Sequence, residues 1–234
     1  MIADAHCHLD YIERIEIPEN MVAFTCGYSH ESNRKNAEIA AERKNVYAVL
    51  GISPRLALQE EHLMDVLPEW IGFIRKSRPV GIGEIGLDFH YGKTETELKR
   101  ESLCFEMMLC LAEEMGLPVV IHSRKATTAV LDVLGRRSLP MLFHCFEGNL
   151  EEAKRAVDMG GIISIPPIRS KNRRKVIKLL PLDKIVVETD APDIGKTPFD
   201  IHVSIEMIAE IKGIGKEEVE DATYRNAMRF FRVG

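Results

Sequence analysis

The sequence lacks the features of a membrane-bound or secreted protein. No apolar run approaches the roughly 20 residues that a membrane-spanning helix needs. The first residues contain no basic patch followed by an apolar stretch, so no signal peptide is expected. The five cysteines show no paired C-x-x-C spacing, and free thiols are expected. These absences predict a cytoplasmic globular protein with no membrane partner.

Positive charge is not in excess either. The chain has 31 Lys and Arg residues against 36 Asp and Glu residues, a formal net charge of −5. This balance argues against indiscriminate electrostatic binding to nucleic acid, although it is compatible with a local basic patch. No Pro/Gly/Ser-rich linker, low-complexity tract or internal repeat divides the 234 residues. We therefore expect a single domain over residues 1–234.

Short apolar runs recur along the chain, and longer segments with helical periodicity lie between them. The runs rarely alternate with polar residues, which is typical of buried parallel strands. They lie at residues 2–8, 21–27, 46–52, 80–85, 118–122, 139–144, 161–165 and 184–188. The helical segments lie at 30–43, 61–76, 95–115, 125–136, 149–159, 170–180, 202–212 and 216–231.

This alternation predicts an α/β fold, a (β/α)8 barrel of the TIM type. An open doubly wound sheet is the alternative, because it uses the same order of elements. No glycine-rich phosphate fingerprint follows the first strand, which weighs against the dinucleotide-binding form of that sheet.

Histidines and carboxylates stand at the carboxyl ends of the predicted strands, where barrel enzymes keep their active sites. His6 and His8 end the first strand, and their two-residue spacing puts both side chains on one face. The other members of the set follow the fourth, fifth, sixth and eighth strands: Glu84, His122, His144 and Asp190. The pattern therefore predicts that all six side chains meet at one mouth of the barrel.

Imidazole and carboxylate groups together suit divalent ions such as Zn²⁺ and Mn²⁺. Six protein ligands are more than one catalytic ion takes while keeping an open position, but two ions about 3.5–4 Å apart would use them all. We expect His6, His8 and Asp190 to hold one ion, and His122 and His144 the other. Glu84 comes from a strand between the two sets and is the candidate bridging ligand.

Five motifs resemble those of the TatD-like metal-dependent hydrolases of the amidohydrolase superfamily. In order along the chain they are Asp4-Ala-His-Cys-His-Leu-Asp10, Gly83-Glu-Ile-Gly-Leu-Asp88, Leu117-Pro-Val-Val-Ile-His-Ser-Arg124, Phe143-His-Cys-Phe-Glu-Gly148 and Glu188-Thr-Asp-Ala-Pro192. The resemblance implies a distorted (β/α)8 barrel, a dinuclear site of Zn, Mn or Mg, and hydrolysis of phosphoester bonds, often in DNA. By this resemblance the six residues above match the family's metal-binding positions.

The sequence departs from this family after its third strand. The family usually has Gly-Ile-His-Pro-His there, whereas this chain has Gly51-Ile-Ser-Pro-Arg55. Ser53 and Arg55 thus replace two histidines at the active-site mouth, which leaves the substrate open. Arg55 and Arg124 are the candidate phosphate-binding residues, because guanidinium groups pair well with phosphate. Asp88 is expected either to orient a metal ligand or to stabilise a turn.

The expected activity is hydrolysis by water activated at the two ions, with a phosphodiester such as DNA as substrate. Asp190 is the candidate proton acceptor and Glu84 the second catalytic carboxylate. One alternative keeps the metals and hydrolyses a carboxylic ester or amide, as an aminoacyl-tRNA deacylase would. The other is a non-catalytic metal-binding scaffold.

Overall fold

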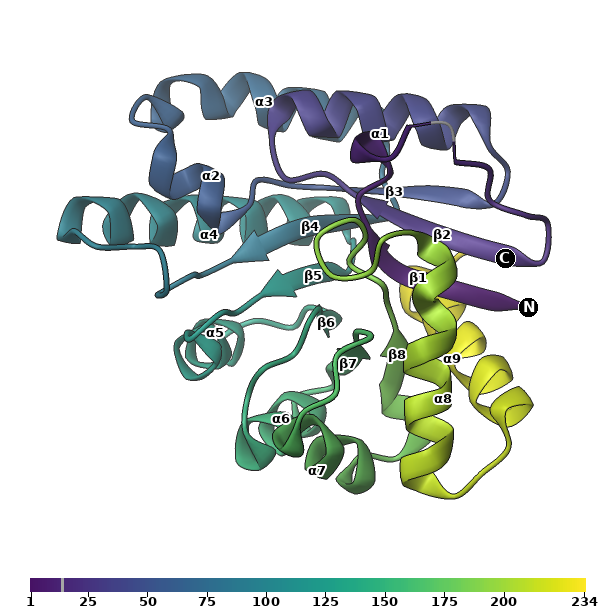
Figure 1. Ribbon diagram of the computed structural model, residues 1–234. Helices are drawn as coiled ribbons and strands as arrows, with labels where there is room; N and C mark the ends of the chain where they lie inside the picture. Colours follow the sequence, from purple (N-terminus) through teal and green to yellow (C-terminus); the bar gives the residue numbers. More distant parts are fainter. Residues whose placement is uncertain (14) are drawn as a thin grey trace.

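Eight parallel strands pair side by side in the order of the sequence, from β1 to β8, and form a nearly closed barrel (Figure 1). The structure is a computed structural model that describes residues 1–13 and 15–234. The strands are β1 Ile2–Cys7, β2 Met21–Cys26, β3 Val46–Leu50, β4 Gly81–Gly86, β5 Val119–His122, β6 Met141–Phe143, β7 Ile162–Ile165 and β8 Ile185–Val187. Each overlaps a predicted strand, and the predicted TIM-type barrel is confirmed.

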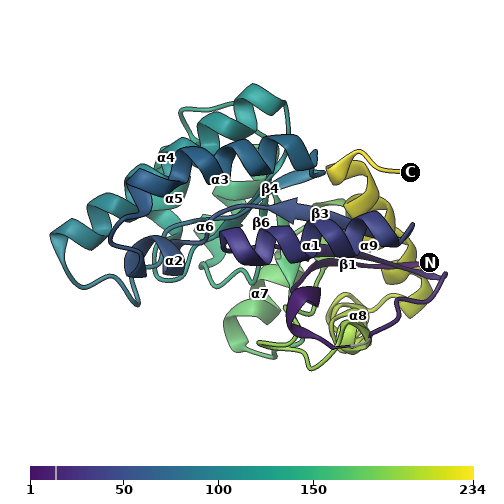
Figure 2. The same ribbon diagram turned by 90° about the horizontal axis from the view of Figure 1, so that it is seen from above.

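Helices cover the outside of the sheet, as Figure 2 shows in a second view. They are α1 His30–Glu42, α2 Pro54–Gln59, α3 Leu63–Ser77, α4 Glu95–Met115, α5 Thr127–Leu134, α6 Leu150–Asp158, α7 Lys171–Leu179, α8 Ile201–Lys212 and α9 Lys216–Phe231. Short 3-10 turns lie at η1 Leu9–Tyr11, η2 Leu182–Lys184 and η3 Pro198–Asp200. No helix within the described part of the chain is long and apolar enough to cross a membrane.

Helix α2 was not predicted, although its start has a clear local signal. The Ser53 hydroxyl accepts a hydrogen bond from the Leu56 amide, and Pro54 occupies the first helical position. Serine at the N-cap followed by proline is a favourable helix start. The helix has only six residues, too few for the three-and-four apolar periodicity from which the other helices were predicted.

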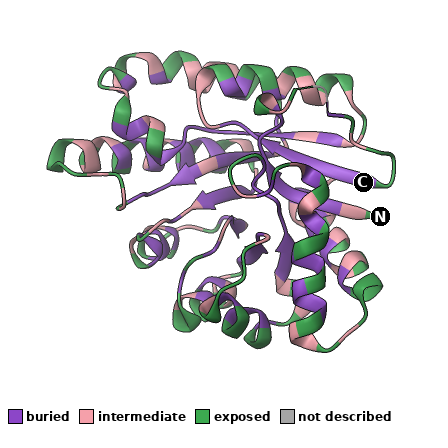
Figure 3. Cartoon of the chain, in the orientation of Figure 1, coloured by how far each residue is buried: buried purple, intermediate pink, exposed green. Residues whose placement is uncertain are grey.

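The barrel has an inner and an outer apolar core, and Figure 3 shows the strands as almost entirely buried. The inner core joins residues from seven of the strands and includes Ala5, Phe24 and Val120, an arrangement that only the barrel interior permits. Phe231 of α9 stacks on Phe24 with the ring centroids 4.0 Å apart. Larger side chains fill the outer core between the strands and the helices.

One extra residue in β1 and one in β4 change which side chains face inward. Asp4 pairs with Ala23 and Cys7 with Thr25, so two residues of β1, Ala5 and His6, lie opposite the single inward-facing Phe24. Such a β-bulge re-aims the side chains that follow it. Strict alternation after the inward-facing Ala3 and Ala5 would turn His6 and His8 outward; the bulge turns them into the barrel.

The bulge in β4 has the same form. Ile82 pairs with Val119 and Ile85 with Ile121, so Gly83 and Glu84 together lie opposite the inward-facing Val120. A Cβ atom on Gly83 would lie 2.6 Å from the Val120 Cβ, which only glycine avoids. Glu84 therefore faces the interior because the residue before it has no side chain.

The seam between β8 and β1 is closed by hydrogen bonds beyond the end of β8. The Asp190 amide donates to the His6 carbonyl over 2.9 Å, and the His8 amide donates to the Ala191 carbonyl over 2.8 Å. The buried Asp4 carboxylate accepts from both the amide and the hydroxyl of Thr189. The seam thus joins the end of β1, with the candidate metal ligands His6 and His8, to the segment after β8, with the candidate metal ligand Asp190.

We expect Thr189→Val to destabilise the fold by about 1–3 kcal/mol, because it removes a hydroxyl donor from the buried Asp4 carboxylate without changing side-chain size. Urea unfolding at neutral pH measures this difference. The matched control is Thr96→Val on the exposed first turn of α4, which should change stability by less than about 0.5 kcal/mol. Equal stabilities for the two variants would show that the seam hydrogen bond contributes nothing.

Candidate metal centre

The carboxyl ends of the strands enclose a cavity of about 730 Å³. Five of the six candidate metal ligands (the donors) line it: His8, Glu84, His122, His144 and Asp190. The sixth, His6, is fully buried and contacts four of the others: His8, Glu84, His144 and Asp190. The structure therefore brings together all six side chains that the strand-end pattern selected.

His6, His8 and Asp190 form the first group of donors. His6 Nε2 lies 3.3 Å from His8 Nε2 and 3.4 Å from Asp190 Oδ1, and His8 Nε2 lies 3.3 Å from the same carboxylate oxygen. One ligand atom from each residue lies within 4.8 Å of the others, a spacing that could hold one ion. This group has the composition expected from the sequence.

His6, Glu84 and His144 form a second group, which shares His6 with the first. Glu84 Oε2 lies 3.7 Å from His6 Nε2 and 3.3 Å from His144 Nε2. His122 stands at the edge of this group, with its Nδ1 3.2 Å from His144 Nε2. Glu84 thus contacts histidines on both sides of the centre, as a bridging ligand would, although the bridge itself stays a prediction.

Hydrogen bonds behind the donors orient two of the imidazole rings. His8 Nδ1 lies 2.7 Å from the Cys26 carbonyl, which can only accept, so Nδ1 holds a proton and Nε2 is the nitrogen that faces the cluster. His122 Nε2 lies 3.0 Å from Asp88 Oδ2, so its Nδ1 faces His144. Such outer partners fix the tautomer of metal-binding histidines.

Asp88 has both of the roles that its position in the sequence left open. One carboxylate oxygen contacts His122, and the other accepts from the amides of His90 and Tyr91, which stabilises the turn after β4. The Asp88 amide in turn donates to Glu101 Oε1 over 2.7 Å.

Glu101 was missed by the sequence analysis, although it lies four residues before Phe105 on the buried face of α4. Burial raises its pKa to about 7 even though the Asp88 amide donates to it. A carboxylate on the apolar face of a long helix was the available signal, because charged side chains are almost never fully buried without a partner.

The donors perturb one another's protonation strongly. Although burial would raise it, hydrogen bonds with His6 and His8 hold the pKa of Asp190 well below its ordinary value. Burial opposes the charged form of His8, but Asp190 and Glu84 raise its pKa to about 10. Burial and the neighbouring His6 hold the pKa of His144 well below its ordinary value.

These pKa shifts favour the charged carboxylate of Asp190, the charged imidazole of His8 and the neutral imidazole of His144. The imidazole Nδ1 atoms of His6 and His144 are also buried, and neither has a hydrogen-bond partner in the described part of the chain. Divalent cations that accept mixed nitrogen and oxygen ligands fit this donor set, because they satisfy its lone pairs without requiring extra protons.

Arg55 and Arg124 lie on the wall of the cavity, as expected for phosphate-binding candidates. Their guanidinium carbons are 5.4 and 5.3 Å from the centre of the Tyr91 ring, and Arg124 Nη1 also donates to the Tyr91 hydroxyl over 3.4 Å. Neither arginine pairs with a carboxylate among residues 1–13 and 15–234. Ser53 lines the same wall, but its hydroxyl is engaged as the cap of α2.

Known proteins resemble this chain along its whole length. Residues 3–232 match the family described as TatD related DNase. A Bacillus subtilis relative named as an uncharacterized metal-dependent hydrolase, YabD, is 30% identical over 262 residues, covering 100% of each chain. Human deoxyribonuclease TATDN3 is 32% identical over 259 residues, covering 98% of this chain and 94% of the relative.

A solved structure shares the fold. The crystal structure of YjjV, a TatD homologue from Escherichia coli, matches with a TM-score of 0.84 and 25% identity, covering 100% of this chain and 98% of that chain. The barrel, the converging donors and the family match over residues 3–232 agree with one another. This chain therefore belongs to the TatD family of metal-dependent hydrolases.

Proposed function

We propose that this protein is a phosphodiesterase that acts on DNA and uses two divalent ions. His6, His8 and Asp190 would bind one ion, and His122 and His144 the other, with Glu84 between them. The observation that supports a phosphate-bearing substrate is the pair of arginines on Tyr91, in the same cavity as the donors. The name of the human relative, a deoxyribonuclease, supports DNA as the substrate class.

The metal ions and the arginines would have separate roles in the proposed reaction. The bound ions would supply Lewis acidity and lower the pKa of the attacking water. Arg55 and Arg124 would hold the phosphate by charge-assisted hydrogen bonds and orient its scissile bond toward the cluster. Both arginines are free to do so because they contact the Tyr91 ring rather than a carboxylate.

Asp190 is the proposed proton carrier. Its Oδ1 faces His6 and His8, and 11% of its side chain remains exposed to the cavity. Oδ2 would accept the proton of the attacking water and return it to the leaving oxygen. Asp190 has a φ of 49°, in the left-handed region that asparagine also tolerates, so the carboxylate can be replaced by an amide without backbone strain.

Hydrolysis of a carboxylic ester or amide is the second candidate, favoured by Ser53 and Arg55 in place of the family's two histidines. The same cluster could activate water for a carbonyl carbon. Parallel assays with phosphodiester, ester and amide substrates distinguish the two reactions. Turnover of the ester or amide alone would reject the phosphodiesterase proposal.

Removal of metal should abolish hydrolysis and lower thermal stability, because ions bound only to the folded state stabilise it. Dialysis against a chelator, followed by addition of Mn²⁺, Zn²⁺ or Mg²⁺, should restore both properties. Elemental analysis of the active protein should give two ions per chain. A single ion per fully active chain would contradict the dinuclear proposal.

Asp190→Asn should lower kcat by about a hundredfold or more, because the amide cannot accept the proton. Circular dichroism and elemental analysis check that the fold and the bound metal are retained. Asp65→Asn, the same change at an exposed position on α3, is the control and should leave kcat unaltered. Full activity of Asp190→Asn with metal bound would rule out the proton-transfer role.

A further inference from the structure

Tyrosine is concentrated at the mouth of the barrel. Aromatic residues make up 6% of the chain, yet three of its five tyrosines line the one cavity that contains the candidate donors. They come from three different loops: Tyr11 follows β1 in η1, Tyr28 follows β2, and Tyr91 follows β4. Tyr91 contacts the two arginines, which leaves Tyr11 and Tyr28 without a part in the reaction described above.

Tyr11 and Tyr28 form a rigid aromatic pair. Their rings are nearly parallel, with an interplanar angle of 7° and centroids 5.5 Å apart, and their hydroxyls are hydrogen-bonded to each other. The ring of His8 meets Tyr28 edge-on at 6.0 Å. His8, Tyr28 and Tyr11 therefore lead from the donor cluster outward, and Tyr11 ends this row with 58% of its surface exposed.

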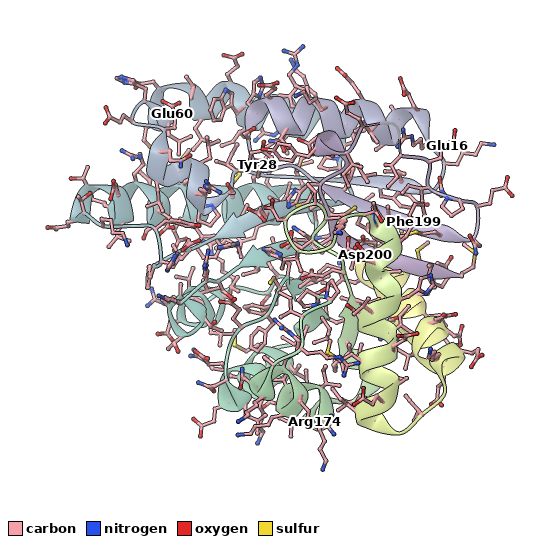
Figure 4. All side chains as sticks on the ribbon, viewed as in Figure 1. Glu16, Tyr28, Glu60, Arg174, Phe199 and Asp200 are labelled. Atoms are coloured by element: carbon pink, nitrogen blue, oxygen red, sulfur yellow. The ribbon has the colours of Figure 1, made fainter. Side chains whose placement is uncertain are left out.

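The aromatic pair adjoins the arginine wall. The Ser53 amide donates to the Tyr28 carbonyl over 2.9 Å, and Arg55 follows two residues later at the start of α2. Figure 4 labels Tyr28 in the connection between β2 and α1.

A phosphate bound by the arginines would thus lie next to the flat, uncharged rings of Tyr11 and Tyr28. The group attached to that phosphate would contact these rings. Aromatic side chains beside a positively charged wall are the combination that binds unpaired nucleotides, since each base has a π-face that stacks on a ring. Tyrosine offers this surface with little loss of side-chain freedom, because here both hydroxyls are already bound.

We propose that Tyr11 and Tyr28 form a stacking site for an unpaired nucleobase of the nucleotide held at the donor cluster. The inference rests on the proposed phosphodiesterase activity and adds a prediction to it: a base of any identity beside the cleaved phosphate strengthens substrate binding. Stacking tolerates all four bases because it uses the ring face and not the hydrogen-bonding edge.

The test compares two single strands of equal length, one with all its bases and one built only of abasic (tetrahydrofuran) nucleotides. Tyr11→Leu should raise KM for the base-bearing strand about tenfold, the scale of one stacked base, and leave kcat nearly unaltered. On the abasic strand the variant and the wild type should be equal. Tyr11→Phe, which keeps the ring, should retain most of the affinity.

Phe199→Leu is the matched control, because Phe199 is 44% exposed in η3, directly before α8 (Figure 4), and does not line the cavity. It should match the wild type on both strands. An unaltered KM for Tyr11→Leu on the base-bearing strand overturns the stacking site, as does an equal loss on both strands. A wild type that cleaves neither strand but hydrolyses a carboxylic ester overturns the proposed function itself.

Discussion

The hydrogen-bonded seam between β1 and β8 is the contact on which the metal centre depends. Asp4 is fully buried and accepts from the Thr189 amide and hydroxyl, so the first strand is tied to the segment that follows the last one. Burial raises the pKa of Asp4 to about 7, and its hydrogen bonds with Thr189 oppose that rise. Asp190 is the next residue, and the seam thereby sets its carboxylate 3.3–3.4 Å from two imidazoles. The hydrogen bonds that close the barrel therefore also bring together the first donor group, His6, His8 and Asp190.

The two bulges solve a packing problem that regular strands cannot. A barrel interior of this size is filled by side chains, which leaves little room for donors near its centre. In each bulge a small residue, Ala5 or Gly83, shares the space opposite one inward-facing side chain with the donor that follows it. The donor gains an inward direction, and the small residue before it leaves room for the inward-facing side chain of the neighbouring strand. His6 and Glu84, which contact each other across the barrel, both reach the centre in this way.

The barrel and the convergence of the six side chains could be predicted because both depend on local features of the sequence. Buried parallel strands are apolar throughout, so a histidine or carboxylate at the end of one stands out, and the carboxyl ends meet wherever the strands pair. Three features could not be predicted: the bulges, the hydrogen bonds of Asp4 and the contact of Glu101 with Asp88. They depend on strand register and tertiary packing, which cannot be read from a single sequence. The two-residue spacing of His6 and His8 indicated a shared face correctly, but the direction of that face depends on the extra residue in β1. Tyr11 and Tyr28 were missed for the same reason, since 17 residues separate them and only the pairing of β1 with β2 brings their loops together.

The donors and the candidate substrate-binding residues come from different parts of the fold, so a change in one set need not alter the other. Strand ends and the residues directly after them supply the six donors, held by ladder hydrogen bonds and by the partners of His8 and His122. Loops and short helices supply the aromatic pair and the arginines, and the Tyr28 ring of this pair contacts the donors at His8. Replacing two histidines of the family pattern by Ser53 and Arg55 therefore alters one wall of the cavity and leaves the cluster intact. Ser53 caps α2 and Arg55 contacts Tyr91, so a position where the family pattern has a titratable imidazole here has a permanent positive charge.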